Sequence, residues 1–162
     1  MHVLVSAATK HGSTAEIASA LGERLREAGL EVTVADPDDV AGLDGIDAAV
    51  LGSAVYAGHW LKPAKALIDR LGGEFAKRPV WLFSSGPLGD PPKPDEDPVD
   101  VAALIGSTGA RDHRIFAGML ERSRLGFAER AIVRALHAPE GDFRDWEAIE
   151  GWAAEIAAEL TG

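Results

Sequence analysis

Hydroxyl-bearing residues gather in one short loop near the N-terminus, where they could bind an anion. Thr9, Ser13 and Thr14 follow the apolar run 2–7 and come just before a helical pattern. At the start of a helix, unpaired backbone N–H groups and the helix dipole converge on one point, which suits a phosphate. The spacing of Ser13 and Glu16 also predicts a capping box that begins the helix.

The kind of phosphate that this loop could bind follows from the patterns that it lacks. It has neither the G-x-x-x-x-G-K-[ST] pattern that surrounds a nucleotide triphosphate nor the G-x-G-x-x-G pattern of dinucleotide-binding folds. Hydroxyls and backbone amides without those patterns suit a single phosphate monoester. The alternative is an ordinary strand-to-helix turn with good caps.

Apolar runs that indicate strands alternate along the chain with amphipathic stretches that indicate helices. We expect strands at 2–7, 31–35, 47–53, 79–85 and 113–119, and helices at 13–28, 62–72, 124–137 and 143–160. Residues 36–45 should form a loop or a poorly formed helical turn. This alternation predicts one α/β domain over residues 1–162, with a parallel sheet that helices cover on both faces.

Two further loops follow predicted strands at the same edge of this sheet. Ligands bind beyond the carboxyl ends of such strands, so the loops after the first, third and fourth strands should form one site. The loop at 53–63 holds Tyr56 and Trp60, whose rings could stack on a flat ligand. Alternatively, Trp60 packs under the helix that it precedes. In the third loop, Gly86 and Gly89 would let backbone amides approach a ligand closely, or would form a plain proline-glycine turn.

Composition and charge exclude several classes of function. The 162 residues include no cysteine, which excludes disulfides, thiolate metal sites and a cysteine nucleophile. No apolar run approaches the roughly 20 residues needed to span a membrane, and no signal-peptide pattern is present, so we expect a cytoplasmic protein. The net charge of −10 argues against nucleic acid as a partner.

One segment departs from the acidic character of the chain. Residues 111–137 contain six arginines and three acidic residues, a net charge of +3. Within them, residues 122–137 have the pattern of a basic amphipathic helix. Such a helix could lie on an anionic membrane surface, which would place the protein peripherally at the inner face of the cell membrane. The alternative is a packed surface helix with solvated arginines.

Several stretches resemble the flavodoxin-like family, in particular the short, single-domain branch that includes the menaquinone-dependent protoporphyrinogen oxidases. These stretches are 8–14, 52–60, 83–87 and 141–146. In that branch an aspartate-tryptophan pair opens the last helix, as Asp145 and Trp146 would here. The resemblance covers nearly the whole chain. It implies a doubly wound, five-stranded parallel sheet in the order 2-1-3-4-5, with FMN at the switch point for which flavodoxin is itself a standard example.

The resemblance also implies which residues contact FMN. Those that would surround the phosphate are Thr9, Lys10, His11, Gly12, Ser13 and Thr14. Those that would line the isoalloxazine are Val55, Tyr56, Ala57, Gly58, His59 and Trp60, and those that would close its other edge are Ser85, Gly86, Pro87, Leu88 and Gly89. No catalytic side chain is expected, because the flavin carries the electrons. His59 could act in proton transfer or could be an ordinary surface histidine.

Three functions are compatible with these patterns. The basic segment favours an FMN oxidoreductase of the protoporphyrinogen oxidase type with a quinone acceptor, because ordinary flavodoxins usually lack this element. The acidic remainder of the chain favours a soluble electron carrier that docks a basic redox partner by electrostatic steering. Ala7, where family members often carry an aromatic residue, is compatible with a binding module that has lost FMN.

Overall fold

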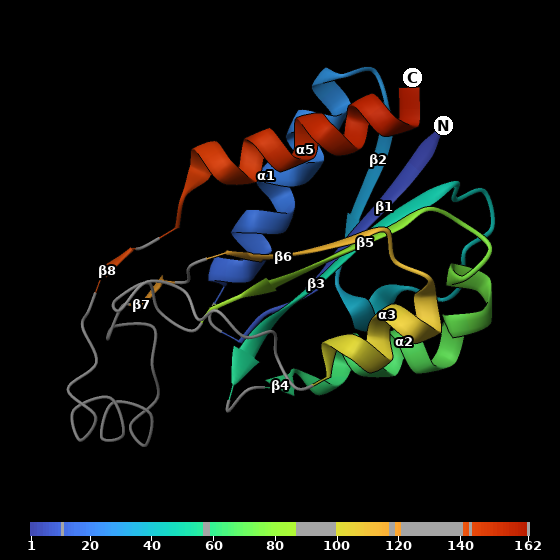
Figure 1. The fold of residues 1–162 in the computed structure, drawn as a ribbon, viewed down its shortest axis with the longest axis horizontal. Coiled ribbons are helices and arrows are strands. Elements are labelled where there is room, and N and C mark those ends of the chain that lie inside the picture. The colour runs from blue at the N-terminus through green and yellow to red at the C-terminus, as the bar shows by residue number, and fades with distance from the viewer. Residues whose placement is uncertain are drawn as a thin grey trace.

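A computed structural model describes residues 1–10, 12–56, 59–86, 100–116, 119–120, 141–142 and 144–161. At its centre, five parallel strands lie in the order β2-β1-β3-β5-β6 (Figure 1). They are β1 (His2–Ala8), β2 (Glu31–Ala35), β3 (Ala48–Tyr56), β5 (Val80–Ser85) and β6 (Asp112–Phe116). Counted along the chain, this is the predicted order 2-1-3-4-5, which the structure confirms.

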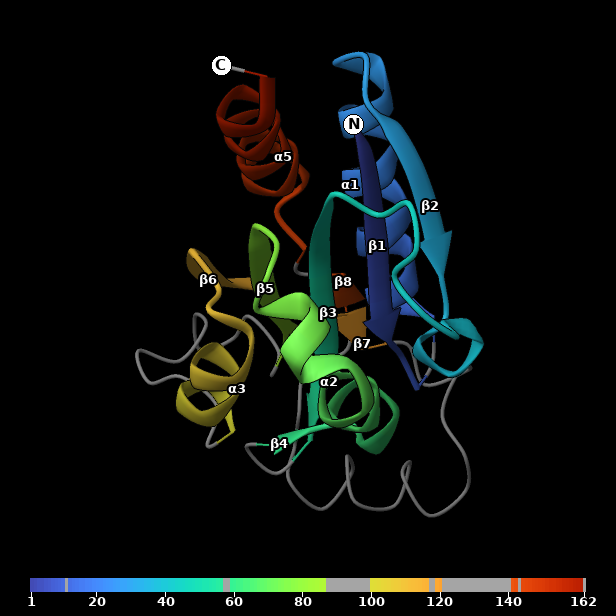
Figure 2. The ribbon, with the colours of Figure 1, turned by 90° about the vertical axis from the view of Figure 1, so that its right-hand side faces the viewer.

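Helices cover both faces of this sheet (Figures 1 and 2). On one face α1 (Ser13–Glu27) packs against α5 (Trp146–Thr161), and on the other face α2 (Lys62–Phe75) packs against α3 (Val101–Thr108). None of the helices in the described ranges is long and apolar enough to cross a membrane.

The apolar runs of the strands supply two cores, one on each face. Because successive strand residues point to opposite faces, Val3 and Val5 of β1 join the core on the α1 side, and Leu4 joins the core on the α2 side. The cores are closely packed where the central strands meet. At Gly52 in β3, an ideal Cβ would lie 2.3 Å from the ring of Phe83 in β5, so no larger residue fits without a shift.

Helix α3, strand β4 and the start of α5 depart from the sequence-based predictions. The helix α3 has no predicted counterpart, because its eight residues are too few to display a helical period. The strand β4 (His59–Trp60) lies inside a predicted loop and pairs antiparallel with β3. The last helix begins at Trp146 rather than at 143, because the Asp145 carboxylate accepts the backbone N–H three residues on at 3.1 Å. The predicted helix 124–137 lies outside the described residues.

A second sheet, of two short strands, lies beyond the carboxyl ends of the main sheet (Figures 1 and 2). It pairs β7 (Met119–Leu120) with β8 (Gly141–Asp142) in antiparallel orientation. The prediction of a fifth strand over 113–119 is therefore corrected: Met119 belongs to this second sheet. The chain leaves β7 into the basic segment and returns at β8, so the segment is attached at the same end of the molecule as the three loops. The predicted loop at 36–45 contains one short 3-10 turn, η1 (Pro37–Asp39).

Candidate functional site

The carboxyl ends of β1, β3 and β5 lie side by side in the sheet. Their register pairs Ala8 with Ser53 and Ala54 with Ser85. The three loops singled out in the sequence therefore start from one edge of the sheet (Figure 1). A ligand at this edge could contact all three loops at once.

The first loop ends at Gly12, directly before α1. Gly12 has a left-handed backbone with φ of 96°, and its N–H donates to the Thr9 hydroxyl at 2.9 Å. The prediction of a capping box is wrong, because Ser13 already belongs to the helix and no side chain caps it. The Glu16 carboxylate instead accepts a hydrogen bond from the Arg144 guanidinium at 2.9 Å.

The first turn of α1 carries donors and one unusual hydroxyl. The Glu16 N–H is the first to bond back along the helix, to the Gly12 carbonyl at 3.1 Å. The N–H groups before it, from Ser13 onward, have no partner within the helix. The Thr14 side chain is only 1% exposed, and its hydroxyl has no hydrogen-bond partner among the described residues.

A buried hydroxyl without a partner costs about 1–3 kcal/mol, and buried polar atoms are rarely left so. A phosphate oxygen at the start of α1 would accept from the Thr14 hydroxyl and from the neighbouring N–H groups. The residues present therefore fit the phosphate of FMN. A second hydroxyl, that of Ser6 in β1, is likewise buried and without a partner in the described part of the chain.

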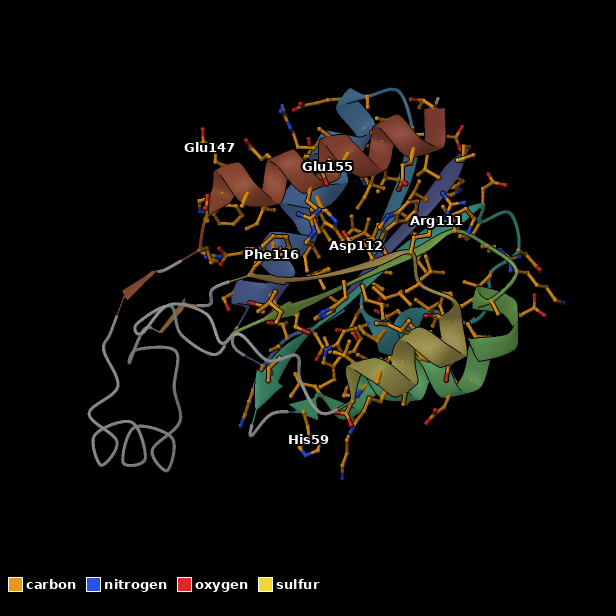
Figure 3. All side chains as sticks on the ribbon, in the orientation of Figure 1. His59, Arg111, Asp112, Phe116, Glu147 and Glu155 are labelled. Carbon is orange, nitrogen blue, oxygen red and sulfur yellow. The ribbon has the colours of Figure 1, made fainter. Side chains whose placement is uncertain are left out.

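The second loop is a hairpin between β3 and β4. Its register pairs Val55 with Trp60 and Tyr56 with His59. The Trp60 side chain is 2% exposed and belongs to the core on the α2 side. This is the alternative that the sequence offered, in which Trp60 packs under the helix that follows. Figure 3 shows His59, in contrast, projecting away from the sheet.

A chain of hydrogen bonds ties this hairpin to β5 and β6. The Trp60 indole N–H donates to the hydroxyl of Ser84 at 2.8 Å, and that hydroxyl lies 2.8 Å from Nε2 of His113. Because the indole can only donate, Ser84 accepts from Trp60, while the direction of the Ser84–His113 hydrogen bond follows the tautomer of the imidazole. The base of the hairpin is therefore fixed to the centre of the sheet.

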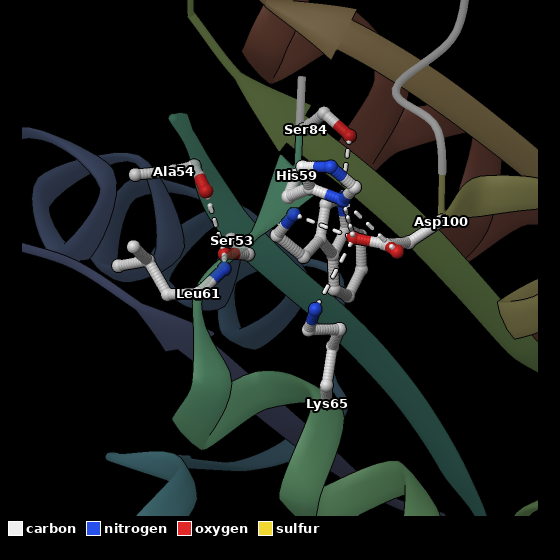
Figure 4. Close-up of polar contacts among 8 residues, drawn as sticks. Ser53, Ala54, His59, Leu61, Lys65, Ser84 and Asp100 are labelled. Carbon is white, nitrogen blue, oxygen red and sulfur yellow. Dashed lines mark hydrogen bonds and ion pairs between the residues drawn. The ribbon is translucent and has the colours of Figure 1, made fainter. Parts of the chain in front are cut away.

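The Asp100 carboxylate, at the start of α3, fixes the hairpin from the other side (Figure 4). It accepts from the Trp60 backbone N–H at 3.0 Å and lies 3.2 Å from Nδ1 of His59 and 3.5 Å from Nζ of Lys65. Partial burial pushes the pKa of Asp100 upward, but the backbone hydrogen bond, the imidazole and the ammonium group outweigh it. The pKa therefore lies below its ordinary value of 3.8.

The third loop begins at Ser85 and Gly86, which close the end of β5. Ser85 is buried, and Gly86 has φ of 86° and donates its N–H to the Phe116 carbonyl at 2.9 Å. An ideal Cβ on Gly86 would lie 4.0 Å from the Val55 carbonyl oxygen, so the second and third loops are neighbours. The remaining predicted contacts lie outside the described residues: His11, Ala57, Gly58, Pro87, Leu88 and Gly89, together with the side chain of Tyr56.

One residue at this edge was not predicted as part of the site. The Arg144 side chain is 5% exposed, and its guanidinium donates to the Ser13 carbonyl at 3.3 Å as well as to Glu16. It also lies 4.6 Å from the centre of the Trp146 ring. These partners are 128 and 131 residues away along the chain. No local pattern in the sequence could have indicated the contact.

We also examined the cavities and the clusters of possible metal ligands away from this edge of the sheet. A cavity of about 300 Å³ at the amino ends of β5 and β6 is lined by Trp81, Arg111, Asp112, Trp152, Glu155, Ile156 and Glu159. Figure 3 places Arg111 and Asp112 at that end. Among the residues that the structure describes, no group of three or more histidine or acidic side chains could hold a metal ion.

The chain matches the flavodoxin domain over residues 4–146. It belongs to the flavodoxin-domain family. Proteins of this family typically bind FMN and take part in electron transfer. The family that the sequence motifs indicated is thus confirmed, together with the five-stranded fold.

Similar proteins include a dehydrogenase and several flavodoxins. The chain is 23% identical to the protoporphyrinogen IX dehydrogenase (quinone) of Escherichia coli strain K12, over 97% of this chain and 95% of that protein. A flavodoxin from the domain Archaea superposes over the full length of both chains with a TM-score of 0.68 and 17% identity. A flavodoxin of Streptococcus pneumonia TIGR4 superposes over 98% of this chain and 99% of its own, with a TM-score of 0.62 and 20% identity. The predicted relationship to the dehydrogenase is confirmed as a distant one over almost the full length.

Proposed function

We propose that this flavodoxin-domain protein binds FMN and passes electrons to a quinone, as an oxidoreductase of the protoporphyrinogen dehydrogenase type. The observation that carries the FMN site is the buried Thr14 hydroxyl at the start of α1, which has no hydrogen-bond partner among the described residues. It lies at the switch point of the sheet, in a chain of a family that typically binds FMN. The full-length relationship to the E. coli dehydrogenase supports the quinone acceptor.

The first loop would hold the phosphate through the helix start. Thr9 keeps Gly12 in its left-handed conformation, which aims the first turn of α1 at the loop. The backbone N–H groups of Ser13 and Thr14 and the Thr14 hydroxyl would then donate to the phosphate, and Lys10 would add a positive charge. Bound FMN would supply the electron transfer itself.

The second and third loops would position the flavin ring. Asp100 and Ser84 hold Trp60 in place, so that the turn between β3 and β4 starts from a fixed base. Gly86 lies beside the Val55 carbonyl, and its lack of a side chain would let a ligand approach the backbone. Tyr56, at the end of β3, is then the aromatic residue of this loop that we expect beside the isoalloxazine, since the Trp60 indole is in the core.

Reconstitution tests both parts of the proposal. Purified protein is mixed with FMN, and bound flavin is measured by its absorbance spectrum and by quenching of its fluorescence. The FMN-loaded protein is then given protoporphyrinogen IX and a menaquinone analogue under anaerobic conditions, and porphyrin fluorescence is followed. We expect porphyrin to form only when protein, FMN and quinone are all present. If the protein does not bind FMN, both parts of the proposal are wrong.

A soluble electron carrier is the second candidate, and the net charge of −10 favours it. An acidic surface attracts a basic redox partner and makes the association rate fall steeply with salt. If the FMN-loaded protein reduces cytochrome c in a salt-dependent way but forms no porphyrin, this is the better account. A binding module without FMN is the third candidate; Ala7, the residue that suggested it, is buried in the core on the α1 side.

A further inference from the structure

The guanidinium of Arg144 is a buried cation attached to the start of α1. It donates to the Ser13 carbonyl and to the Glu16 carboxylate, and its side chain is 5% exposed. It comes from the segment just before α5 and stacks on the ring of Trp146 at 4.6 Å. A contact of this kind fixes the first turn of α1 relative to the start of the last helix.

The two arginines of α1, Arg24 and Arg26, differ from Arg144 in their environment. Arg24 pairs with Glu27 and Arg26 with Glu23, but these arginine side chains are 44% and 45% exposed. Ion pairs so close to solvent contribute little to stability or to binding. The charge of Arg144 is screened far less, because water is largely excluded from it.

The charges around the start of α1 favour an anion. The N-terminus of the helix is equivalent to about half a positive charge. Arg144 adds one positive charge, and its partner Glu16 is half-exposed, so water screens the carboxylate more than it screens the guanidinium. An independent observation at the same turn is that the Thr14 hydroxyl has no acceptor within the described part of the chain.

We propose that Arg144 makes this site select a phosphorylated flavin over riboflavin. It acts as a positioning residue, which holds the first turn of α1 in place and adds a positive charge beside the bound phosphate. This inference rests on the proposed FMN site. It goes beyond that site because it names a residue, distant in sequence from the phosphate loop, that determines which flavin binds.

The test compares the affinities of the protein for FMN and for riboflavin, measured by fluorescence titration. Arg144→Met removes the charge, Arg144→Lys keeps the charge, and Glu16→Gln removes the opposing charge. Arg24→Met is the matched control. It alters net charge equally, but Arg24 lies about 16 Å from Ser13 along the helix, beyond the screening length of about 8 Å at physiological salt. Thermal unfolding without flavin shows whether each variant is folded.

We expect Arg144→Met to weaken FMN about tenfold or more and riboflavin much less, because only FMN carries the phosphate. Arg144→Lys should restore part of the selectivity. Glu16→Gln should bind FMN at least as tightly as the parent, which tests the inference even if Arg144→Met fails to fold. Arg24→Met should leave both affinities unchanged.

Two results would overturn the inference while leaving the FMN site intact. One is an equal loss of FMN and riboflavin affinity in Arg144→Met, which would make Arg144 a structural brace only. The other is a weakening of FMN by Glu16→Gln. If the parent protein binds neither flavin, the proposed function itself fails, and the two failures are thereby distinguished.

Discussion

The backbone N–H of Trp60 donates to the carboxylate of Asp100 at 3.0 Å, although the two residues are 40 positions apart. The same Trp60 donates its indole N–H to Ser84 in β5. The hairpin between β3 and β4 is therefore held at two points, by the start of α3 and by the centre of the sheet. Both contacts lie at the base of the loop in which we expect the flavin ring.

Asp100 should stabilise the protein in a pH-dependent way. Its pKa in the folded state is below the ordinary value of 3.8, so its contribution is present above about pH 4 and is lost as the pH falls through the folded pKa. Asp100→Asn should therefore lower the free energy of unfolding at pH 7, and the difference from the parent should shrink below about pH 4. Chemical denaturation at several pH values measures this. Asp69→Asn, at an exposed position of α2, is the control; an Asp100→Asn difference that is equal at pH 3 and pH 7 would contradict the prediction.

Thr14→Val should have opposite effects on stability and on FMN binding. Valine keeps the shape of threonine and removes a buried hydroxyl that has no partner among the described residues, so the flavin-free protein should gain about 1 kcal/mol. FMN should bind about tenfold more weakly, whereas riboflavin should be unaffected, because the lost bond is to the phosphate. Denaturation and fluorescence titration measure the two effects.

The matched control for this prediction is Thr108→Val in α3. The Thr108 hydroxyl is also fully buried, but it donates to the Leu104 carbonyl at 2.8 Å. The same substitution should there lower stability by about 1 kcal/mol and leave FMN binding unchanged. The double variant Ser13→Ala/Thr14→Ala should likewise weaken FMN far more than riboflavin. Equal losses for the two flavins would count against phosphate binding at this loop.

We expect Tyr56 to contribute to FMN binding and Trp60 to contribute to the stability of the fold. Tyr56→Ala should weaken FMN by roughly 1 kcal/mol beyond the effect of burial and should reduce the quenching of flavin fluorescence. Trp60→Ala should instead lower the free energy of unfolding by about 3–5 kcal/mol, because it empties a core position. If both variants bind and quench FMN as the parent does, this loop does not hold the ring.

The basic segment 122–137 should bind anionic membranes weakly and in a salt-sensitive manner. Each arginine near such a surface adds about 1 kcal/mol. We expect the protein to co-sediment with anionic vesicles at low salt and to be released at high salt. A variant with Arg122, Arg124, Arg130 and Arg134 changed to glutamine should remain in solution, whereas Arg24→Gln/Arg26→Gln should behave as the parent. No vesicle binding at low salt, together with no reduction of a menaquinone analogue, would favour the soluble carrier.

Local sequence patterns were sufficient to predict the strands and helices that are defined by residues close together in the chain. The apolar run 2–7 became β1, and the helix over 13–28 ended one residue early, at Glu27, just before Gly29 with its φ of 94°. These patterns work because the period of burial and the conformational freedom of glycine depend on near neighbours. The helix α3 has only eight residues, which is too short for a helical period to be recognised in the sequence.

The amino-acid sequence was enough to predict the fold class, the family and the three loops that meet at one edge, because few sheet topologies are compatible with alternating strands and helices. The environment of single side chains became known only from the three-dimensional structure. The Trp60 side chain is buried in the core. The Glu16 carboxylate does not form the predicted cap but accepts a hydrogen bond from Arg144, 128 residues away. Both outcomes depend on partners that approach only when the sheet has formed. The spacing of residues along the chain carries no information about such partners.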